Sequence, residues 1–197
     1  MKMSPADLDA LTEVLNIGIG RAASSLSRMV ETRVELRVPR IELIDLDEDS
    51  SVNDSTSYNM SIVQGFDGKI SGNAILGFPE ESGKKLACLL NGQDSSSEIS
   101  EFELAGVLTE VGNVVLNGVL GSLANLLNMP LQYQVPEFGL STEPNGHFSK
   151  GTDETRSLLV ADAEFCVNER NIHGAIVVGF QLGSLETLIE TLSLLSL

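Results

Sequence analysis

The chain has 197 residues, which is enough for one sizeable hydrophobic core and predicts a single domain. Hydrophobic residues make up 42% of it and charged residues 20%, a balance that excludes a disordered chain. The formal net charge of -16 argues against binding to a phosphate backbone, so no nucleic-acid partner is expected.

The first residues lead directly into an amphipathic pattern that contains acids, not into an apolar export signal. No apolar run approaches the roughly 18–20 residues that a membrane span requires. Cys88 and Cys166 lie in apolar segments without a CxxC spacing, so we expect them to be free thiols of a reducing compartment. These features predict a cytoplasmic protein without membrane insertion.

The first predicted element is a long amphipathic helix. Ser4 precedes Pro5, and Asp7 follows three residues later, which is typical of an N-cap, a first-turn proline and an acidic capping partner. Apolar side chains then recur every three or four positions and predict one buried stripe. The stripe consists of Leu8, Leu11, Leu15, Ile19, Ala22, Leu26 and Met29.

The rest of the first half predicts strands and a short helix. Residues 33–36 alternate as a strand, and residues 47–57 are polar enough for a solvated loop. Residues 58–65 and 69–77 form two strands joined at an Asp-Gly hairpin signal. A helix follows from Pro79, with acids in its first turn, and ends at Asn91-Gly92.

The second half follows the same order of elements. Ser100 and Glu103 form a Ser-x-x-Glu capping box ahead of a second long apolar helix. After it come a strand at 131–135, a loop at 139–154, a hairpin of 157–167 with 172–182, and a helix at 185–195.

An internal repeat explains this similarity between the halves. Residues 11–41 align with residues 108–138 without a gap, and the shared positions include acid, amide and proline residues. Leu11, Thr12, Glu13, Val14 and Asn16 fall on Leu108, Thr109, Glu110, Val111 and Asn113. We therefore predict one domain with internal repeats at about 5–92 and 100–197. Its fold class is α/β of the α+β type, a pseudo-two-fold domain whose mostly antiparallel sheet is covered by helices.

The repeated glutamate and asparagine are the candidate functional residues. Glu13 and Asn16 share one helical face, as do Glu110 and Asn113, and the first pair falls mostly on the flank away from the buried stripe. A carboxylate and a carboxamide make a poor nucleophile set. A carboxylate can instead pair with a lysine ammonium on a partner, while an asparagine can hold a water molecule. Such a pair suits phosphoryl transfer, which depends largely on positioning and electrostatics.

The pattern Asp-x-x-x-Glu-x-x-Asn at Asp9, Glu13 and Asn16, with its second copy, resembles the CheC-type phosphatases of bacterial chemotaxis, the relatives of CheX and FliY. The resemblance extends over nearly the whole chain, and the doubled motif makes it specific. It implies a phosphatase of the phosphorylated response regulator CheY. Glu13 and Glu110 would engage the regulator's active-site lysine, and Asn16 and Asn113 would orient the attacking water.

The same resemblance implies further properties. The chain would carry no cofactor of its own, Mg²⁺ would belong to the regulator, and a CheD-like receptor deamidase would be a second partner. The second copy has Gly106 where the first has Asp9, so we expect the second site to be weaker or differently supported. Gly112 is expected to loosen the second helix by roughly 1 kcal/mol relative to alanine.

Alternative interpretations of these residues remain at this stage. The Glu/Asn pairs can be ordinary polar helix faces. Asn117 could extend the second face, but it is interpreted as a solvated helix residue. A non-catalytic adaptor of the flagellar switch or of receptor adaptation, binding CheY or CheD, is the second candidate function, because one fold can bind without chemistry. The helical glycines at 18, 20, 112, 118 and 121 suit close packing better than a phosphate loop.

Overall fold

The computed structural model describes residues 5–38, 41–45, 58–94, 96, 98–126, 128, 130–140, 155–167, 169–181 and 183–195. Its first half contains α1 (Pro5–Met29), β1 (Val34–Arg37), β2 (Ile41–Asp45), β3 (Met60–Asp67), β4 (Gly72–Phe78) and α2 (Glu80–Leu90). The second half contains α3 (Glu101–Leu126), β5 (Gln132–Tyr133), β6 (Glu137–Leu140), β7 (Thr155–Val167), β8 (Arg170–Gln181) and α5 (Ser184–Leu195). Each half therefore runs helix, two short strands, hairpin and helix.

All described strands join one antiparallel sheet, in which the two halves exchange their short strands. The hairpins β3–β4 and β7–β8 meet in the middle, where β4 pairs with β8. On one side β1 and β2 of the first half pair with β7, and on the other β5 and β6 of the second half pair with β3. This arrangement confirms the predicted pseudo-two-fold α+β fold with a mostly antiparallel sheet.

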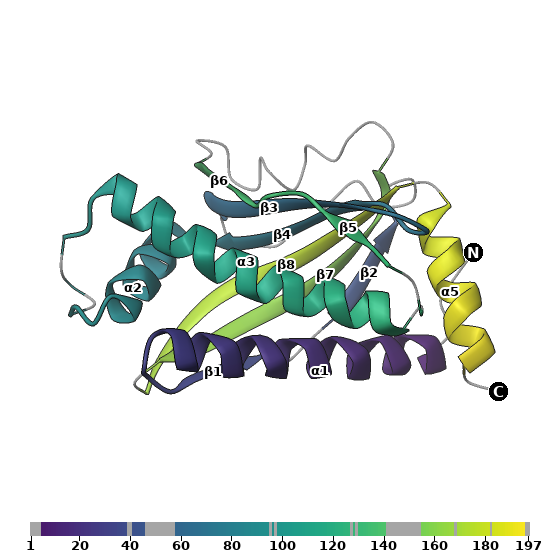
Figure 1. Cartoon of the computed structure of the whole chain (residues 1–197), viewed down its shortest axis with the longest axis horizontal. Helices are drawn as coiled ribbons and strands as arrows, with labels where there is room; N and C mark the ends of the chain where they lie inside the picture. Colours follow the sequence, from purple (N-terminus) through teal and green to yellow (C-terminus); the bar gives the residue numbers. More distant parts are fainter. Residues whose placement is uncertain are drawn as a thin grey trace.

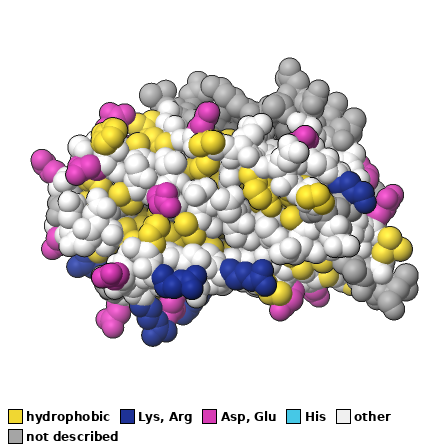
Figure 2. All heavy atoms as spheres, viewed as in Figure 1, with side chains coloured by type: hydrophobic (Ala, Val, Ile, Leu, Met, Phe, Trp, Pro, Cys, Tyr) yellow, Lys and Arg dark blue, Asp and Glu magenta, His cyan; other side chains and the backbone are white. Residues whose placement is uncertain are grey.

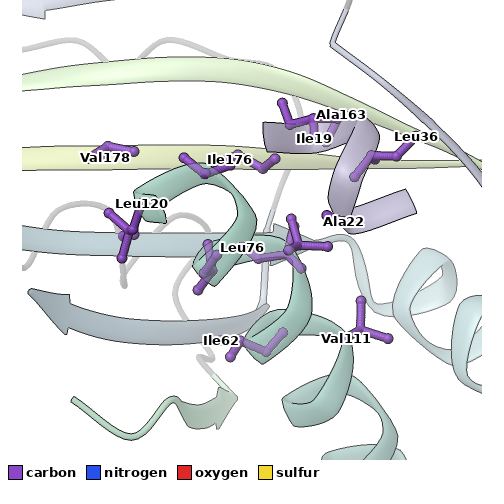
Figure 3. Close-up of a cluster of buried hydrophobic side chains, with 14 of the residues drawn as sticks. Ile19, Ala22, Leu36, Ile62, Leu76, Val111, Leu120, Ala163, Ile176 and Val178 are labelled. Atoms are coloured by element: carbon purple, nitrogen blue, oxygen red, sulfur yellow. The ribbon is translucent and has the colours of Figure 1, made fainter. Parts of the chain in front are cut away.

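The two long helices cover one face of this sheet side by side (Figure 1). Their side chains form the main hydrophobic core with those of the central strands, as Figure 3 shows for part of the cluster. In that view α1 and α3 contribute Ile19, Ala22, Val111 and Leu120, and the strands contribute Leu36, Ile62, Leu76, Ala163, Ile176 and Val178. Burial of this apolar surface is the main force that holds the helices on the sheet.

The predicted stripe of α1 is buried along most of its length. Five of its members are at most 2% exposed: Leu11, Leu15, Ile19, Ala22 and Leu26. By contrast, Leu8 is half-buried and Met29 is 43% exposed. The prediction that Met29 is buried is therefore wrong. Met29 is the last residue of the helix, where the chain turns away toward β1.

The repeat extends to the backbone conformation at the ends of both long helices. Glu31 follows α1 with a φ of 51°, and Asn128, at the corresponding position of the second copy, follows α3 with a φ of 49°. A left-handed residue just past a helix is a common way to satisfy its last carbonyl groups. The two halves thus end their long helices in the same way although the residue types differ.

Local signals predicted several boundaries correctly. The Ser100 hydroxyl donates to Glu103 Oε2 at 2.6 Å, and the amide of Ser100 donates to the same oxygen at 3.2 Å. These two hydrogen bonds lower the pKa of Glu103. The amide of Glu103 donates in turn to the Ser100 hydroxyl oxygen at 3.3 Å, which together with the bond from the Ser100 amide confirms the capping box of α3. The β3–β4 and β7–β8 hairpins and the end of α2 at Asn91 also lie close to their predicted positions. Ser4, the proposed cap of α1, lies outside the described residues.

Other strand predictions need correction. The strand predicted at 131–135 is limited to Gln132–Tyr133, and a separate strand, Glu137–Leu140, begins after Pro136 and includes two residues predicted as loop. Proline has no N–H to donate, so it interrupts the ladder that β5 and β6 make with β3. Strand Ile41–Asp45 was not predicted. The loop predicted at 47–57 and most of that at 139–154 lie outside the described residues.

Helix α3 also differs from the expectation that no segment could span a membrane. By length and composition it is apolar enough to cross one. Ten of its residues are buried, however, and they pack against α1, β3 and β4. This packing accounts for the apolar composition of the helix.

Candidate functional site

The first Glu/Asn pair lies on the solvent side of α1. Glu13 and Asn16 are both exposed, while Leu15 beside them is 2% exposed and belongs to the core. Asp9, one turn earlier, is exposed as well. The buried stripe thus turns both functional candidates outward, as the helical spacing predicts.

The second pair occupies the matching face of α3 but is less open. Glu110 is exposed and Asn113 is half-buried. Gly106, which stands where α1 has Asp9, has no heavy atom within 4 Å of the place a Cβ would occupy. The second pair therefore lacks the neighbouring acid and faces open space on that side.

Asn113 is held by a chain of carboxamides that the sequence did not reveal. Asn117 Nδ2 donates to Asn113 Oδ1 at 2.8 Å, and Gln64 Nε2 donates to Asn117 Oδ1 at 3.0 Å. The same Gln64 nitrogen donates to the backbone carbonyl of Gln134 at 3.1 Å. Asn117 is half-buried and bonded on both sides, so its interpretation as a solvated residue was wrong.

One sequence signal could have pointed to Gln64, although not to its partners. In β3, the alternate residues Ile62, Gln64 and Phe66 face the helices. Gln64 is only 2% exposed. A glutamine in an otherwise apolar row is a buried polar group that must find hydrogen-bond partners.

Glycines set the distance between the helices that carry the two pairs. A Cβ on Gly18 would collide with the carbonyl oxygen of Gly118 and the hydroxyl of Ser122, and a Cβ on Gly118 would lie 3.0 Å from Ala22. These contacts pair earlier residues of α1 with later residues of α3, so the helices are antiparallel. Gly112 likewise lies directly against Ile62. Close packing thus explains Gly18, Gly112 and Gly118, whereas Gly20 and Gly121 face open space.

Each pair lies near the middle of its helix, and the antiparallel packing offsets the two pairs along the helix axes. Gly18 lies level with the stretch between Gly118 and Ser122, so Asn113 lies level with a position about nine residues beyond Asn16 in α1, or about 14 Å along the axis. Both pairs nevertheless belong to helices on the same face of the sheet (Figure 1). Each pair is therefore a separate site.

Figure 2 shows the face of the molecule on which α1 and α3 lie. The middle of this face carries few charged side chains. Glu110 is the last charged residue of α3, because Val111 to Leu126 contain no acid or base. On α1 the exposed cations Arg21 and Arg28 follow Asn16. Along α3, Glu110 is thus followed by the amides of Asn113 and Asn117 and by no further charge.

Two surface hollows lie away from the pairs. One, of about 430 Å³, is lined by Arg33, Glu35, Cys166 and Glu169. The guanidinium groups of Arg37 and Arg33 lie beside Glu35 and lower the pKa of its carboxyl. The other, of about 440 Å³, lies between the end of α3 and β5. Within the described ranges, no group of three or more His, Cys, Asp or Glu side chains could hold a metal ion. The Glu/Asn pairs stand on open helix surface, which suits a protein partner better than a small molecule.

Comparison with known proteins points to one family. The CheC-like family model matches residues 7–43, a segment that contains Glu13 and Asn16. The CheY-P phosphatase CheC of Bacillus subtilis is 26% identical over 137 residues, which cover 68% of this chain and 66% of that protein. A CheC1 protein of Halobacterium salinarum is 21% identical over 172 residues, covering 86% of this chain and 87% of that protein.

Solved structures share the fold. Thermotoga maritima FliY matches with a TM-score of 0.78 at 19% identity, covering 98% of both chains. FliM in the FliM–SpeE complex of Helicobacter pylori matches with a TM-score of 0.70 at 14% identity, covering 100% of this chain and 99% of that one. CheX of Desulfovibrio desulfuricans matches with a TM-score of 0.55 at 14% identity, covering 86% and 99%. Together with the CheC relatives and the doubled motif, these matches support the predicted resemblance to the CheC/CheX/FliY family.

Proposed function

We propose that this protein is a phosphatase that removes the phosphoryl group from the aspartate of a CheY-type response regulator. The observation that carries the proposal is the repeated Glu-x-x-Asn motif on matching faces of α1 and α3, exposed at Glu13, Asn16 and Glu110 and half-buried at Asn113. The named activity of the Bacillus subtilis relative, a CheY-P phosphatase, supports the choice of substrate.

The proposed chemistry leaves most of the reactive groups on the regulator. Water attacks phosphorus in line, a new P–O bond forms, and the bond between phosphorus and the aspartyl oxygen breaks, leaving a carboxylate and inorganic phosphate. Asn16 or Asn113 would hold the water, and Glu13 or Glu110 would accept hydrogen bonds from the regulator's lysine ammonium. Orienting one water in this way can supply a large part of the rate.

The other partner assignments rest on the family alone. This chain would need no cofactor of its own, and the Mg²⁺ that neutralises the phosphoryl oxygens would be bound by the regulator. A CheD-like receptor deamidase is a further partner that we propose from the resemblance. The site of action would be the cytoplasm, without nucleic acid or membrane insertion.

A non-catalytic adaptor is the second candidate function. The fold similarity to FliM favours it, because two of the matched FliM structures are complexes, one with SpeE and one with FliG. In that case the helix face would bind the regulator or another switch component without accelerating hydrolysis.

The phosphatase is tested by following phosphate release from a phosphorylated cognate regulator. We expect the Asn16→Ala/Asn113→Ala variant to accelerate phosphate release about 100-fold less than the wild-type chain, because the water is no longer positioned. Asn171→Ala, an exposed asparagine of β8, is the matched control and should retain the full rate. Equal rates for the double variant and the wild-type chain would contradict the proposed roles of Asn16 and Asn113.

A further inference from the structure

We propose that Asn117 is a positioning residue of the second site, through which the buried Gln64 fixes the direction in which Asn113 presents its carboxamide. The inference rests on the proposed function and adds a residue that the Glu-x-x-Asn motif does not contain. It concerns the second site only, because position 20 of α1, which corresponds to Asn117, is glycine.

The direction of the hydrogen-bond chain follows from its backbone end. The Gln134 carbonyl can only accept, so the Gln64 atom that faces it must be the nitrogen, Nε2. That nitrogen uses its other proton on Asn117, so the atom of Asn117 that it meets is Oδ1. Asn117 Nδ2 is then left to donate to Asn113, which must accept through Oδ1.

The consequence for Asn113 is a fixed orientation. With Oδ1 turned toward Asn117, its Nδ2 is the end that remains for a partner, with two N–H donors. A carboxamide that accepts a hydrogen bond at its oxygen becomes a stronger donor at its nitrogen, because hydrogen bonds in a chain polarise one another. Asn113 is therefore held in the orientation that presents donors to a water molecule or a phosphoryl oxygen.

The buried end of the chain is costly to maintain. Gln64 is 2% exposed, and its Oε1 has no hydrogen-bond partner among the described residues. A leucine or methionine at this place would avoid an unpaired buried oxygen. The glutamine gains its two hydrogen bonds to Gln134 and Asn117 instead, which is the arrangement that orients Asn113.

The first site lacks these contacts. Asn16 is exposed, and Gly20, one turn later, has no side chain that could reach it. There is room for a side chain at that position, because a Cβ on Gly20 would meet nothing within 4 Å. Asn16 must therefore lose side-chain freedom when a regulator binds, whereas Asn113 is oriented beforehand. The sites differ in preorganisation, and the second, despite lacking the acid at position 106, is the better ordered.

Chains with one working site test the role of Asn117. In an Asn16→Ala chain, all turnover comes from the second site, and we expect Asn117→Asp to lower its kcat about tenfold with KM unchanged. Aspartate has the size of asparagine but cannot donate to Asn113 Oδ1. Asn125→Asp, the same change at an exposed position of α3, is the matched control and should leave kcat unchanged.

An Asn113→Ala chain shows whether the effect is structural. Its turnover comes from the first site, which Asn117→Asp should not alter. Equal losses in both backgrounds, or no loss in the Asn16→Ala background, overturn the positioning role. A wild-type chain that does not accelerate hydrolysis at all overturns the proposed function instead, and the positioning role with it.

Hydrogen exchange of side-chain amides gives a readout that does not depend on turnover. In the free wild-type chain, the carboxamide protons of Gln64 and Asn117 should exchange slowly and those of Asn113 faster, by NMR. Rapid exchange at both Gln64 and Asn117 overturns the hydrogen-bond chain.

Discussion

The proposed chemistry depends on where single carboxamides and carboxylates point. Glu13 and Asn16, and likewise Glu110 and Asn113, could be selected from the sequence because the same residue types recur in two gap-free copies. The contact of Gln64 with Asn117 could not be predicted, because it joins residues 53 positions apart. It depends on how α3 lies across β3, which only packing determines.

The capping box of α3 provides a pH-dependent prediction. Hydrogen bonds from Ser100 lower the pKa of Glu103 in the folded chain, so the ionised carboxylate stabilises the fold. That stability is present above the unfolded pKa of about 4.3 and is lost as the pH falls through the lower folded value. We expect Ser100→Ala to lower the free energy of unfolding at neutral pH.

The difference between Ser100→Ala and the wild-type chain should shrink below about pH 4, as Glu103 is protonated in both. Urea unfolding of both chains at a series of pH values measures this difference in the free energy of unfolding. Glu101→Gln, which removes a neighbouring carboxylate without touching Ser100, is the control. A difference that stays constant down to the acid limit would mean that Ser100 does not act through the Glu103 carboxylate.

At the scale of elements, helix ends and hairpins were predictable because their signals are local. Ser100 with Glu103 and the Asp-Gly turn after β3 each involve residues at most a few positions apart. The division of the 131–140 segment into β5 and β6 was not predictable, because it depends on pairing with β3 on either side of Pro136. The length of such short strands is decided by the neighbouring strand, not by their own residues.

The contact between α1 and α3 leads to a stability prediction. Gly18→Ala places a methyl group against the Gly118 carbonyl and the Ser122 hydroxyl, so we expect the free energy of unfolding to fall by about 1–3 kcal/mol. Gly20→Ala, two residues along the same helix, meets nothing within 4 Å and should raise it by up to about 1 kcal/mol. Urea unfolding compares the two variants. Changes of the same sign and size would contradict the close approach of the helices at Gly18.

At the scale of the whole molecule, the repeat produces two candidate sites on one face of a shared sheet. The repeated order of elements could be predicted, but the exchange of short strands between halves could not, since each short strand pairs with the hairpin of the other copy. The exchange means that neither half closes its own sheet. The domain bounds of the two repeats, about 5–92 and 100–197, stay a prediction.

Two separate sites predict a specific pattern of partial loss. Because Asn16 and Asn113 lie on different helices and are offset along their axes, we expect Asn16→Ala and Asn113→Ala each to retain part of the activity, with larger loss for Asn113→Ala. The two losses should account for the loss of the double variant, as independent sites require. Complete loss on changing either asparagine alone would mean that the pairs act as one site.

The central claim is catalysis by the Glu/Asn pairs, and counting turnovers tests it most directly. A cognate regulator is phosphorylated, the phosphate donor is removed, and a far smaller amount of this chain is added while inorganic phosphate is measured. We predict that all regulator phosphate is released faster than by the regulator alone, and that the Asn16→Ala/Asn113→Ala chain does not accelerate its release. Binding to the phosphorylated regulator without faster release would contradict the phosphatase and identify an adaptor.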